Sequence, residues 1–243
     1  PTVTIATAEL HTADPIPLLE HFCRSAETDL AAALRNVTGS FALAFCQSGA
    51  NCFALATDHF GIRPLYYRHC GNRLVFGTHL ASLLELLDEP YAIDLQSVYH
   101  YLNFSYVPGP QTIYQQTCVL PPGMMLVYRE GVLDVSPYWR MNYPADATAS
   151  EEELAFRLRM EIEQAVRKSA LDKDGYAPLG TFLSGGTDSG AISGILSQVT
   201  SPLKAYSIAF DEDEYNELHY AKLLARSFGL DHRVHQLTAD ELL

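Results

Sequence analysis

Hydrophobic positions in the first half of the chain form short apolar runs separated by tight turns. Apolar residues recur at helical spacing between Pro17 and Asn36, which predicts a helix there. The following runs predict strands at Gly39–Phe45, at Asn51–Thr57, from Pro64 onward and at Arg73–Gly77, and then a short helix at His79–Leu87. Closely spaced strands of this kind indicate an antiparallel sheet. Residues 1–16 have no clear period and receive no element.

An aromatic and proline-rich stretch follows, from Tyr99 to Trp139. Its Pro-Gly pairs predict two turns and a hairpin. We expect the aromatic side chains at positions 99, 101, 104 and 106 to pack between two domains rather than to stack on bases.

The second half of the chain follows a different pattern. Ser150 and Glu153 form a capping box, which predicts a helix that runs to about Ser169. Strands and helices then alternate: strands at Leu179–Leu183, Leu203–Phe210 and Arg233–Leu237, with helices at Ser189–Gln198 and Tyr215–Phe228. Such alternation is typical of a parallel sheet with crossover helices. A polar linker over residues 141–150 places the domain boundary near residue 146.

Composition narrows the classes of function. The 243 residues carry 16 Lys and Arg against 29 Asp and Glu, a formal charge of −13. This charge disfavours nucleic acid as a partner, because duplex binders need a basic surface, and it disfavours an anionic membrane surface for the same reason. No apolar run reaches the ~18 residues of a membrane span. Five cysteines without a CxxC pair fit a reducing compartment, so we expect a cytoplasmic location.

The sharpest motif is the segment from Ser184 to Ser189, which reads Ser-Gly-Gly-Thr-Asp-Ser between a predicted strand and a predicted helix. Gly185 and Gly186 allow close approach of the backbone to an anion, and the helix start directs free N–H groups toward it. The hydroxyls of Ser184, Thr187 and Ser189 can add donors. The Asp188 carboxylate would repel phosphate unless Mg²⁺ lay between them. The lysine of a Walker loop is absent.

Four motifs in the same order resemble one known family. The 184–189 segment resembles the SGGxDS pyrophosphate loop of ATP pyrophosphatases, and residues 205–221 resemble the next strand and helix of asparagine synthetases. Upstream, Asp58–Tyr67 is similar to the DxxGxRPLYY turn of the glutaminase half of that family. Residues 106–114 and 120–123 resemble its interdomain part, which closes at Tyr138-Trp139.

The resemblance to the glutamine-hydrolysing asparagine synthetase family implies a fold of two parts. Residues 1–146 would form a partial N-terminal-nucleophile (Ntn) glutaminase-like αββα sandwich, a class II glutamine amidotransferase domain. Residues 147–243 would begin a Rossmann-like, parallel-sheet ATP pyrophosphatase domain. A homodimer stays open.

The same resemblance implies a ligase that activates a carboxylate, aspartate in the family, as an acyl-adenylate. AMP and pyrophosphate are released, and ammonia from glutamine attacks the adenylate. The cofactors implied are ATP and Mg²⁺, and the partners are small molecules: ATP, the carboxylate amino acid, and glutamine or ammonia. Leu183 and Ile208 would lie against adenine, the phosphates would be held by Ser184, Gly185, Gly186, Thr187, Asp188 and Ser189, and Asp188 would ligate the metal.

The N-terminal part departs from the family pattern. The family nucleophile is a Cys at the first position, whereas residue 1 is Pro and the first cysteine, Cys23, fits a buried structural role. We therefore expect no glutamine hydrolysis by this polypeptide and assign it no catalytic residue. The absent initiator Met and the short synthetase half predict a piece of a longer chain.

Two other functions stay open: a ring-closing relative such as a β-lactam synthetase or a lasso-peptide cyclase, and a non-catalytic nucleotide-binding or scaffolding remnant. Four polar features receive structural interpretations. His232 and His235 alternate to opposite strand faces, which disfavours a metal pair, and the acidic run 211–214 fits a solvated loop. Glu217 is a slightly better metal candidate, and Asp58 with Arg63 fits a turn that joins two strands.

Overall fold

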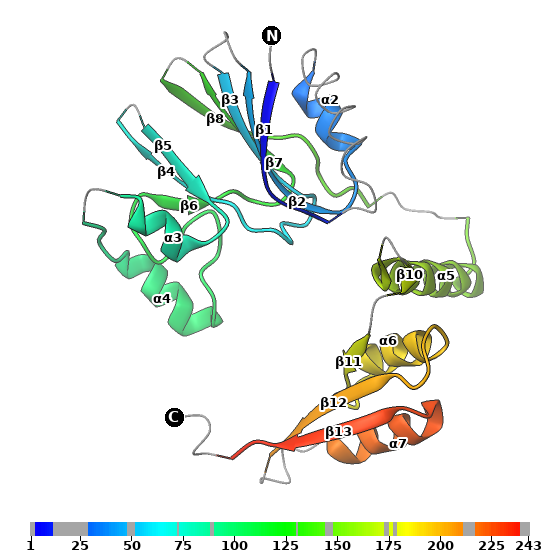
Figure 1. The fold of residues 1–243 in the computed structure, drawn as a ribbon. Coiled ribbons are helices and arrows are strands. Elements are labelled where there is room, and N and C mark those ends of the chain that lie inside the picture. Colours follow the sequence, from blue (N-terminus) through cyan, green and yellow to red (C-terminus); the bar gives the residue numbers. More distant parts are fainter. Residues whose placement is uncertain are drawn as a thin grey trace. The chain divides into compact units, whose positions relative to one another are not determined.

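The structure is a computed structural model, and it describes residues 3–11, 29–47, 52–71, 73–87, 90–129, 131–143, 148–172, 175–176, 179–210 and 217–238. The chain divides into two compact units, Pro1–Tyr143 and Pro144–Leu243, and each is described by itself (Figure 1).

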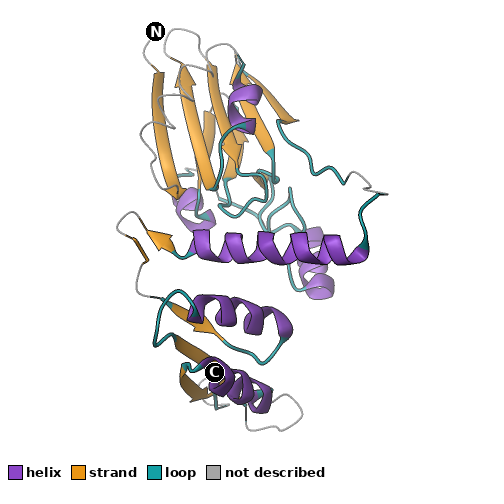
Figure 2. Cartoon of the chain, turned by 90° about the vertical axis from the view of Figure 1, so that its right-hand side faces the viewer, coloured by secondary structure: helices purple, strands orange, loops and turns teal. Residues whose placement is uncertain are grey.

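The first unit contains two antiparallel sheets, which Figure 2 shows as orange arrows. The larger sheet has the strand order β1-β2-β3-β7-β8 and the smaller sheet has the order β5-β4-β6. In chain order the strands are β1 (Val3–His11), β2 (Ser40–Gln47), β3 (Cys52–Thr57), β4 (Tyr66–Cys70), β5 (Arg73–Gly77), β6 (Thr117–Val119), β7 (Met124–Arg129) and β8 (Val132–Pro137).

Strand β2 is buried on both faces, and this explains its unbroken apolar sequence. Phe41, Leu43 and Phe45 pack on one side with Leu34 of helix α2 (Leu30–Arg35). The alternate residues Ala42 and Ala44 pack on the other side with a cluster that includes Leu65 and Leu120, next to the smaller sheet. Helix α3 (Leu80–Glu85) packs against strands β4 and β5 of that sheet. The unit is therefore an αββα sandwich, as the family resemblance implied.

Strand β1, helix α4 and the short strand β6 of the first unit were not predicted. Strand β1 pairs with β2, but its register shifts between Thr7 and Glu9, and such a bulge breaks the two-residue period that would reveal a strand. Helix α4 (Leu95–Phe104) was wrongly taken as part of turns, because it buries only a polar residue, Ser97, while Leu95 and Leu102 are exposed. The predicted hairpin is present as β7 and β8. Much of the helix predicted from Pro17 lies outside the described residues.

The second unit follows the predicted alternation closely. Strands β11 (Gly180–Phe182), β12 (Lys204–Ala209) and β13 (Asp231–Gln236) form a parallel sheet in that order. Helices α6 (Thr187–Ser197) and α7 (Leu218–Phe228) connect them. The predicted parallel-sheet start of the domain is therefore confirmed. A short pair of strands, β9 (Leu171–Asp172) and β10 (Gly175–Tyr176), was not predicted.

The crossover helices cover one face of this sheet. Ala205 and Ala209 of β12 are fully buried and alternate with the exposed residues Tyr206 and Ile208. Leu183 and Ala205 pack against Ala221 and Ala225 of α7. Successive right-handed crossovers place their helices on the same side of a parallel sheet, which accounts for one covered and one open face.

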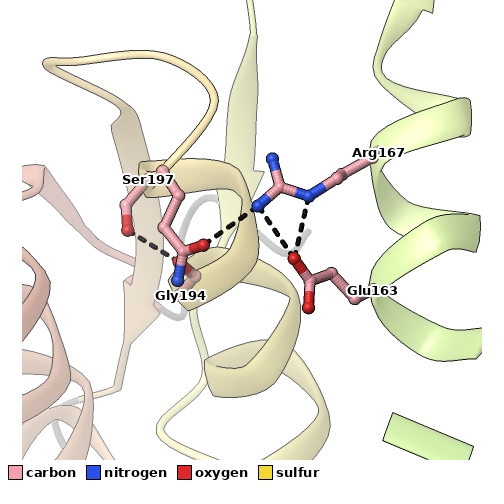
Figure 3. Close-up of polar contacts among 5 residues, drawn as sticks. Glu163, Arg167, Gly194 and Ser197 are labelled. Carbon is pink, nitrogen blue, oxygen red and sulfur yellow. Dashed lines mark hydrogen bonds and ion pairs between the residues drawn. The ribbon is translucent and has the colours of Figure 1, made fainter. Parts of the chain in front are cut away.

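Helix α5 (Glu151–Ser169) precedes this sheet. Its N-cap is Ser150, whose hydroxyl accepts the backbone N–H of Glu153, as the capping box predicted. Near its other end, Arg167 pairs with Glu163 at 2.9 Å and donates to the side chain of Gln198 at the end of α6 (Figure 3). The described part of the chain contains no helix long and apolar enough to cross a membrane.

Candidate functional site

The 184–189 loop lies between strand β11 and helix α6, where the sequence placed it. Its shape is held by two serine hydroxyls. Ser189 Oγ accepts the backbone N–H of Ser184 at 3.2 Å, lies 2.9 Å from Ser184 Oγ and donates to the Gly186 carbonyl. Ser184 Oγ accepts the backbone N–H of Gly186 at 3.2 Å. These hydroxyls therefore organise the loop itself, and their role as additional donors to phosphate stays a prediction.

Gly185 allows the loop to pass close to helix α7. Its φ of +92° lies in the left-handed region that favours glycine. A Cβ at this position would lie 2.9 Å from the Glu217 carbonyl oxygen and 2.9 Å from Tyr220 Cβ. Both the backbone angle and the lack of space thus require glycine here.

Helix α6 begins at the end of the loop without a hydrogen bond from a capping side chain. As in any helix, the N–H groups of the first turn, here those of Thr187, Asp188 and Ser189, lack intrahelical partners. The N-cap, Gly186, has no side chain that could accept them. This arrangement attracts anions, since the helix dipole adds to the exposed donors. Asp188 is exposed in the first turn. A phosphate group there would need a cation near this carboxylate, a position that suits Mg²⁺.

A cavity of about 500 Å³ opens beside the loop. It lies within the size range of small-molecule sites. Its lining comes from the ends of β11 and β12 and from the start of α7: Phe182, Leu183, Ser184, Tyr206, Ser207, Ile208, Phe210, Glu217, Leu218 and Ala221.

Phe182 is among the lining residues of the cavity that the sequence did not identify. Leu183 lines the cavity but is only 1% exposed, because it packs in the core beneath α7. Phe182, its neighbour on the open sheet face, is 78% exposed, and Ile208 is 54% exposed. Strand alternation would have identified Phe182, once the face covered by the helices was known.

The predicted metal ligands are only partly brought together. Glu217 lines the cavity, whereas Asp188 is not among its lining residues. Among the described residues, no group of three or more His, Cys, Asp or Glu side chains could hold a metal ion. The acidic run 211–214 lies outside the described residues. The ligands expected for Mg²⁺ are therefore the Asp188 carboxylate and the phosphate oxygens of the bound nucleotide.

Histidine 232 makes a different contact. Its Nε2 atom lies 2.7 Å from the Ser207 hydroxyl oxygen, in the strand next to it. Burial lowers the pKa of His232, and the nearby positive charge of Lys222 lowers it further. Both effects favour the neutral form of the His232 imidazole.

In the first unit, the 58–67 turn is structural, as the sequence interpretation favoured. The Asp58 side chain is 1% exposed and accepts backbone N–H groups from Phe41, Phe60, Ile62 and Arg63. A carboxylate used in this way connects the end of β3 to β2 and has little capacity left for a ligand.

The described cysteines do not form a nucleophilic site. Cys46, Cys70 and Cys118 are free thiols, and Cys23 lies outside the described residues. Burial raises the pKa of Cys118, although a hydrogen bond from Tyr67 opposes this shift. A thiol with a raised pKa is a weaker nucleophile at neutral pH because less of it is thiolate.

Comparison with known proteins identifies the two units. The family model described as "Glutamine amidotransferase domain" matches residues 18–139, half of the chain, and the model described as "Asparagine synthase" matches residues 157–243.

Individual relatives agree with these matches. Asparagine synthetase [glutamine-hydrolyzing] 1 of Bacillus subtilis is 27% identical over 212 residues, which cover 87% of this chain and 33% of the relative. A putative asparagine synthetase of Methanocaldococcus jannaschii is 24% identical over 203 residues, covering 82% of this chain and 39% of the relative. Amidase chry2 of Gibberella zeae is 27% identical over 227 residues, with 86% and 32% covered. The chain thus spans about a third of the length of these relatives.

A Bacillus subtilis structure of glutamine phosphoribosylpyrophosphate amidotransferase matches with 13% identity and a TM-score of 0.35, covering 96% of this chain and 45% of that one. The matched family models define the class as a glutamine amidotransferase domain followed by an asparagine synthase unit. The chain belongs to the asparagine synthetase family.

Proposed function

We propose that the intact protein is an ATP-dependent, asparagine synthetase-type amidotransferase. It activates a carboxylate, most simply that of aspartate, as an acyl-adenylate with release of pyrophosphate, and ammonia then attacks to form the amide and release AMP. The observation that carries this proposal is the 184–189 loop, with its required Gly185 and the free first turn of α6, beside a cavity of about 500 Å³.

Each part of the site has a role in this proposal. Negative charge develops on the departing pyrophosphate, so donors held ready at the start of α6 stabilise the transition state more than the ground state. Asp188 would hold Mg²⁺, which supplies charge neutralisation at the phosphates. Ile208 and Leu183 would contact adenine, and exposed Phe182 adds apolar surface to the same wall.

We further propose that this 243-residue polypeptide does not hydrolyse glutamine. A nucleophile of this type needs a reactive side chain and a free α-amine on the same residue. None of the described cysteines can supply that combination. Release of ammonia from glutamine by the purified polypeptide would overturn this proposal.

Exchange of labelled pyrophosphate into ATP tests the main proposal directly, because reversal of adenylation requires a bound carboxylate. The intact protein with MgATP and aspartate is expected to catalyse the exchange, and Asp188→Asn is expected to reduce it at least tenfold. Exchange that depends on a carboxylate bearing its own amine, and not on aspartate, would indicate a ring-closing enzyme. Absence of both exchange and MgATP binding would leave the non-catalytic remnant.

A further inference from the structure

The first peptide group of the 184–189 loop is held at both ends by side chains. This group joins Leu183 to Ser184, so it carries the Leu183 carbonyl and the Ser184 N–H. The Ser184 N–H donates to Ser189 Oγ at 3.2 Å, within the loop. The Leu183 carbonyl accepts the hydroxyl of Ser207 from strand β12. Rotation of this peptide group would break both contacts and change the direction in which the loop leaves the sheet.

Histidine 232 orients the Ser207 hydroxyl. A serine hydroxyl has one hydrogen, and in Ser207 it is donated to the Leu183 carbonyl. The Ser207 oxygen must therefore accept at its contact with His232, 2.7 Å away, which requires the Nε2–H tautomer of the imidazole. Ser207 is only 6% exposed, so water has little access to replace the imidazole as donor. The lowered pKa of His232 agrees with a neutral ring in this position.

We infer that His232 is a positioning residue for pyrophosphate: it acts through Ser207 to fix the Leu183–Ser184 peptide group and so the phosphate-binding shape of the 184–189 loop. This inference rests on the proposed function, because it assigns His232 a role in the binding of phosphate groups. His232 itself does not touch the ligand. These two hydrogen bonds connect three neighbouring strands. His232 lies on β13, Ser207 lies on β12, and Leu183 directly follows β11.

If His232 has this role, its replacement should weaken the binding of phosphate groups and leave the binding of the nucleoside unchanged. Binding of magnesium pyrophosphate and of adenosine, which lacks phosphates, is measured by calorimetry on the intact protein and its variants. His232→Ala is expected to weaken magnesium pyrophosphate about five- to tenfold, the usual effect of one buried hydrogen bond, and to leave adenosine within about twofold. His232→Gln is expected to restore pyrophosphate binding, because its amide can donate to Ser207.

The matched control is His235→Ala. This histidine is on the same strand, but an odd spacing of three residues directs it to the opposite face, beside Ile208, so pyrophosphate binding should be unchanged. Melting temperatures of all variants separate misfolding from the expected effect, and His232→Gln extends the test if His232→Ala does not fold. Equal loss of both ligands, or no loss of either, would overturn the inference. Failure of the unmodified protein to bind either ligand would instead overturn the proposed function.

Discussion

The Asp58 carboxylate accepts the backbone N–H of Phe41 at 3.2 Å, and this bond connects the turn after strand β3 to the beginning of the neighbouring strand β2. Three further N–H groups, from Phe60, Ile62 and Arg63, point to the same two oxygens at 3.0 Å. The turn that contains Asp58 thus holds strands β3 and β2 together, and its contribution can be measured as a change in the free energy of unfolding.

Replacing Asp58 with Asn should destabilise the first unit. An amide presents an NH₂ group where one carboxylate oxygen accepted two backbone N–H groups, so two buried donors would face another donor. We expect the free energy of unfolding to fall by about 2–4 kcal/mol. The only tryptophan, Trp139, packs on His59 in this unit at a ring distance of 4.9 Å, so its fluorescence during urea unfolding reports the change.

Asp134→Asn is the matched control for Asp58→Asn, because Asp134 lies on the exposed side of β8. Its unfolding midpoint should move little. If Asp58→Asn unfolds at the same urea concentration as the unmodified chain, the carboxylate does not hold the turn.

Alanine at position 185 tests the required glycine of the loop. The added Cβ would meet the backbone of Glu217 and the side chain of Tyr220, and φ of +92° adds strain. We expect MgATP affinity to fall at least tenfold and the melting temperature of the second unit to fall as well. Gly229 also has a positive φ, +64°, but a Cβ there meets nothing within 4 Å. Gly229→Ala should therefore cost only about 1–2 kcal/mol of stability, with MgATP binding retained. Equal effects on binding would contradict this assignment.

The fold was predictable wherever local sequence and long-range packing agree. Three local signals in the sequence have the expected role in the structure. Ser150 caps a helix, the run from Phe41 to Phe45 forms a buried strand, and Gly229 ends a helix. Strand β1 lacked such a signal because a bulge interrupts its alternation. Helix α4 lacked one because it turns Ser97 inward and leaves its large apolar residues exposed.

The candidate site was predictable as a loop but not as a cavity. A sequence motif locates Gly185 and Asp188, because their chemistry is local. The choice between Leu183 and Phe182 as the exposed wall depends on which sheet face the helices cover. The contact of Ser207 with His232 depends on the register of two strands 25 residues apart, which no local pattern contains.

The pH dependence of the first unit should reflect the partly buried Tyr67 and the buried Tyr138. Burial, together with the neighbouring Cys118, raises the pKa of Tyr67 to about 12, from 10.0. The folded state therefore keeps this proton at a pH where the unfolded chain has lost it, so the stability contribution is complete below pH 10 and disappears as pH rises toward 12. Burial, and then the charge of Asp58, also raises the pKa of Tyr138, whose hydroxyl donates to the Thr57 carbonyl.

Urea unfolding of Tyr67→Phe at several pH values between 9 and 12 tests this linkage. We expect a less steep loss of stability across pH 10–12 than in the unmodified chain, because one of the groups that releases a proton on unfolding is absent. Tyr143 is 84% exposed, and Tyr143→Phe serves as the control that should keep the original slope. Parallel pH profiles for the unmodified chain and Tyr67→Phe would show that burial of this hydroxyl has no thermodynamic effect.

Asp188 and Thr187 are exposed neighbours in the first turn of α6. Substitutions at these two positions distinguish the effect of losing a negative charge from the effect of a small change in side-chain size in the proposed metal site. Asp188→Asn keeps the shape of the side chain but removes the charge that Mg²⁺ would contact, so we expect MgATP affinity to fall about tenfold or more. ATP binding in EDTA should change in the opposite direction, because the substitution also removes repulsion between the carboxylate and the phosphates. Thr187→Ser keeps a hydroxyl and the backbone N–H, and its MgATP affinity should stay within about twofold. Calorimetry with and without Mg²⁺ distinguishes these results, and a loss in Asp188→Asn that is equal in EDTA and in Mg²⁺ would show that this carboxylate supports the loop without binding the metal.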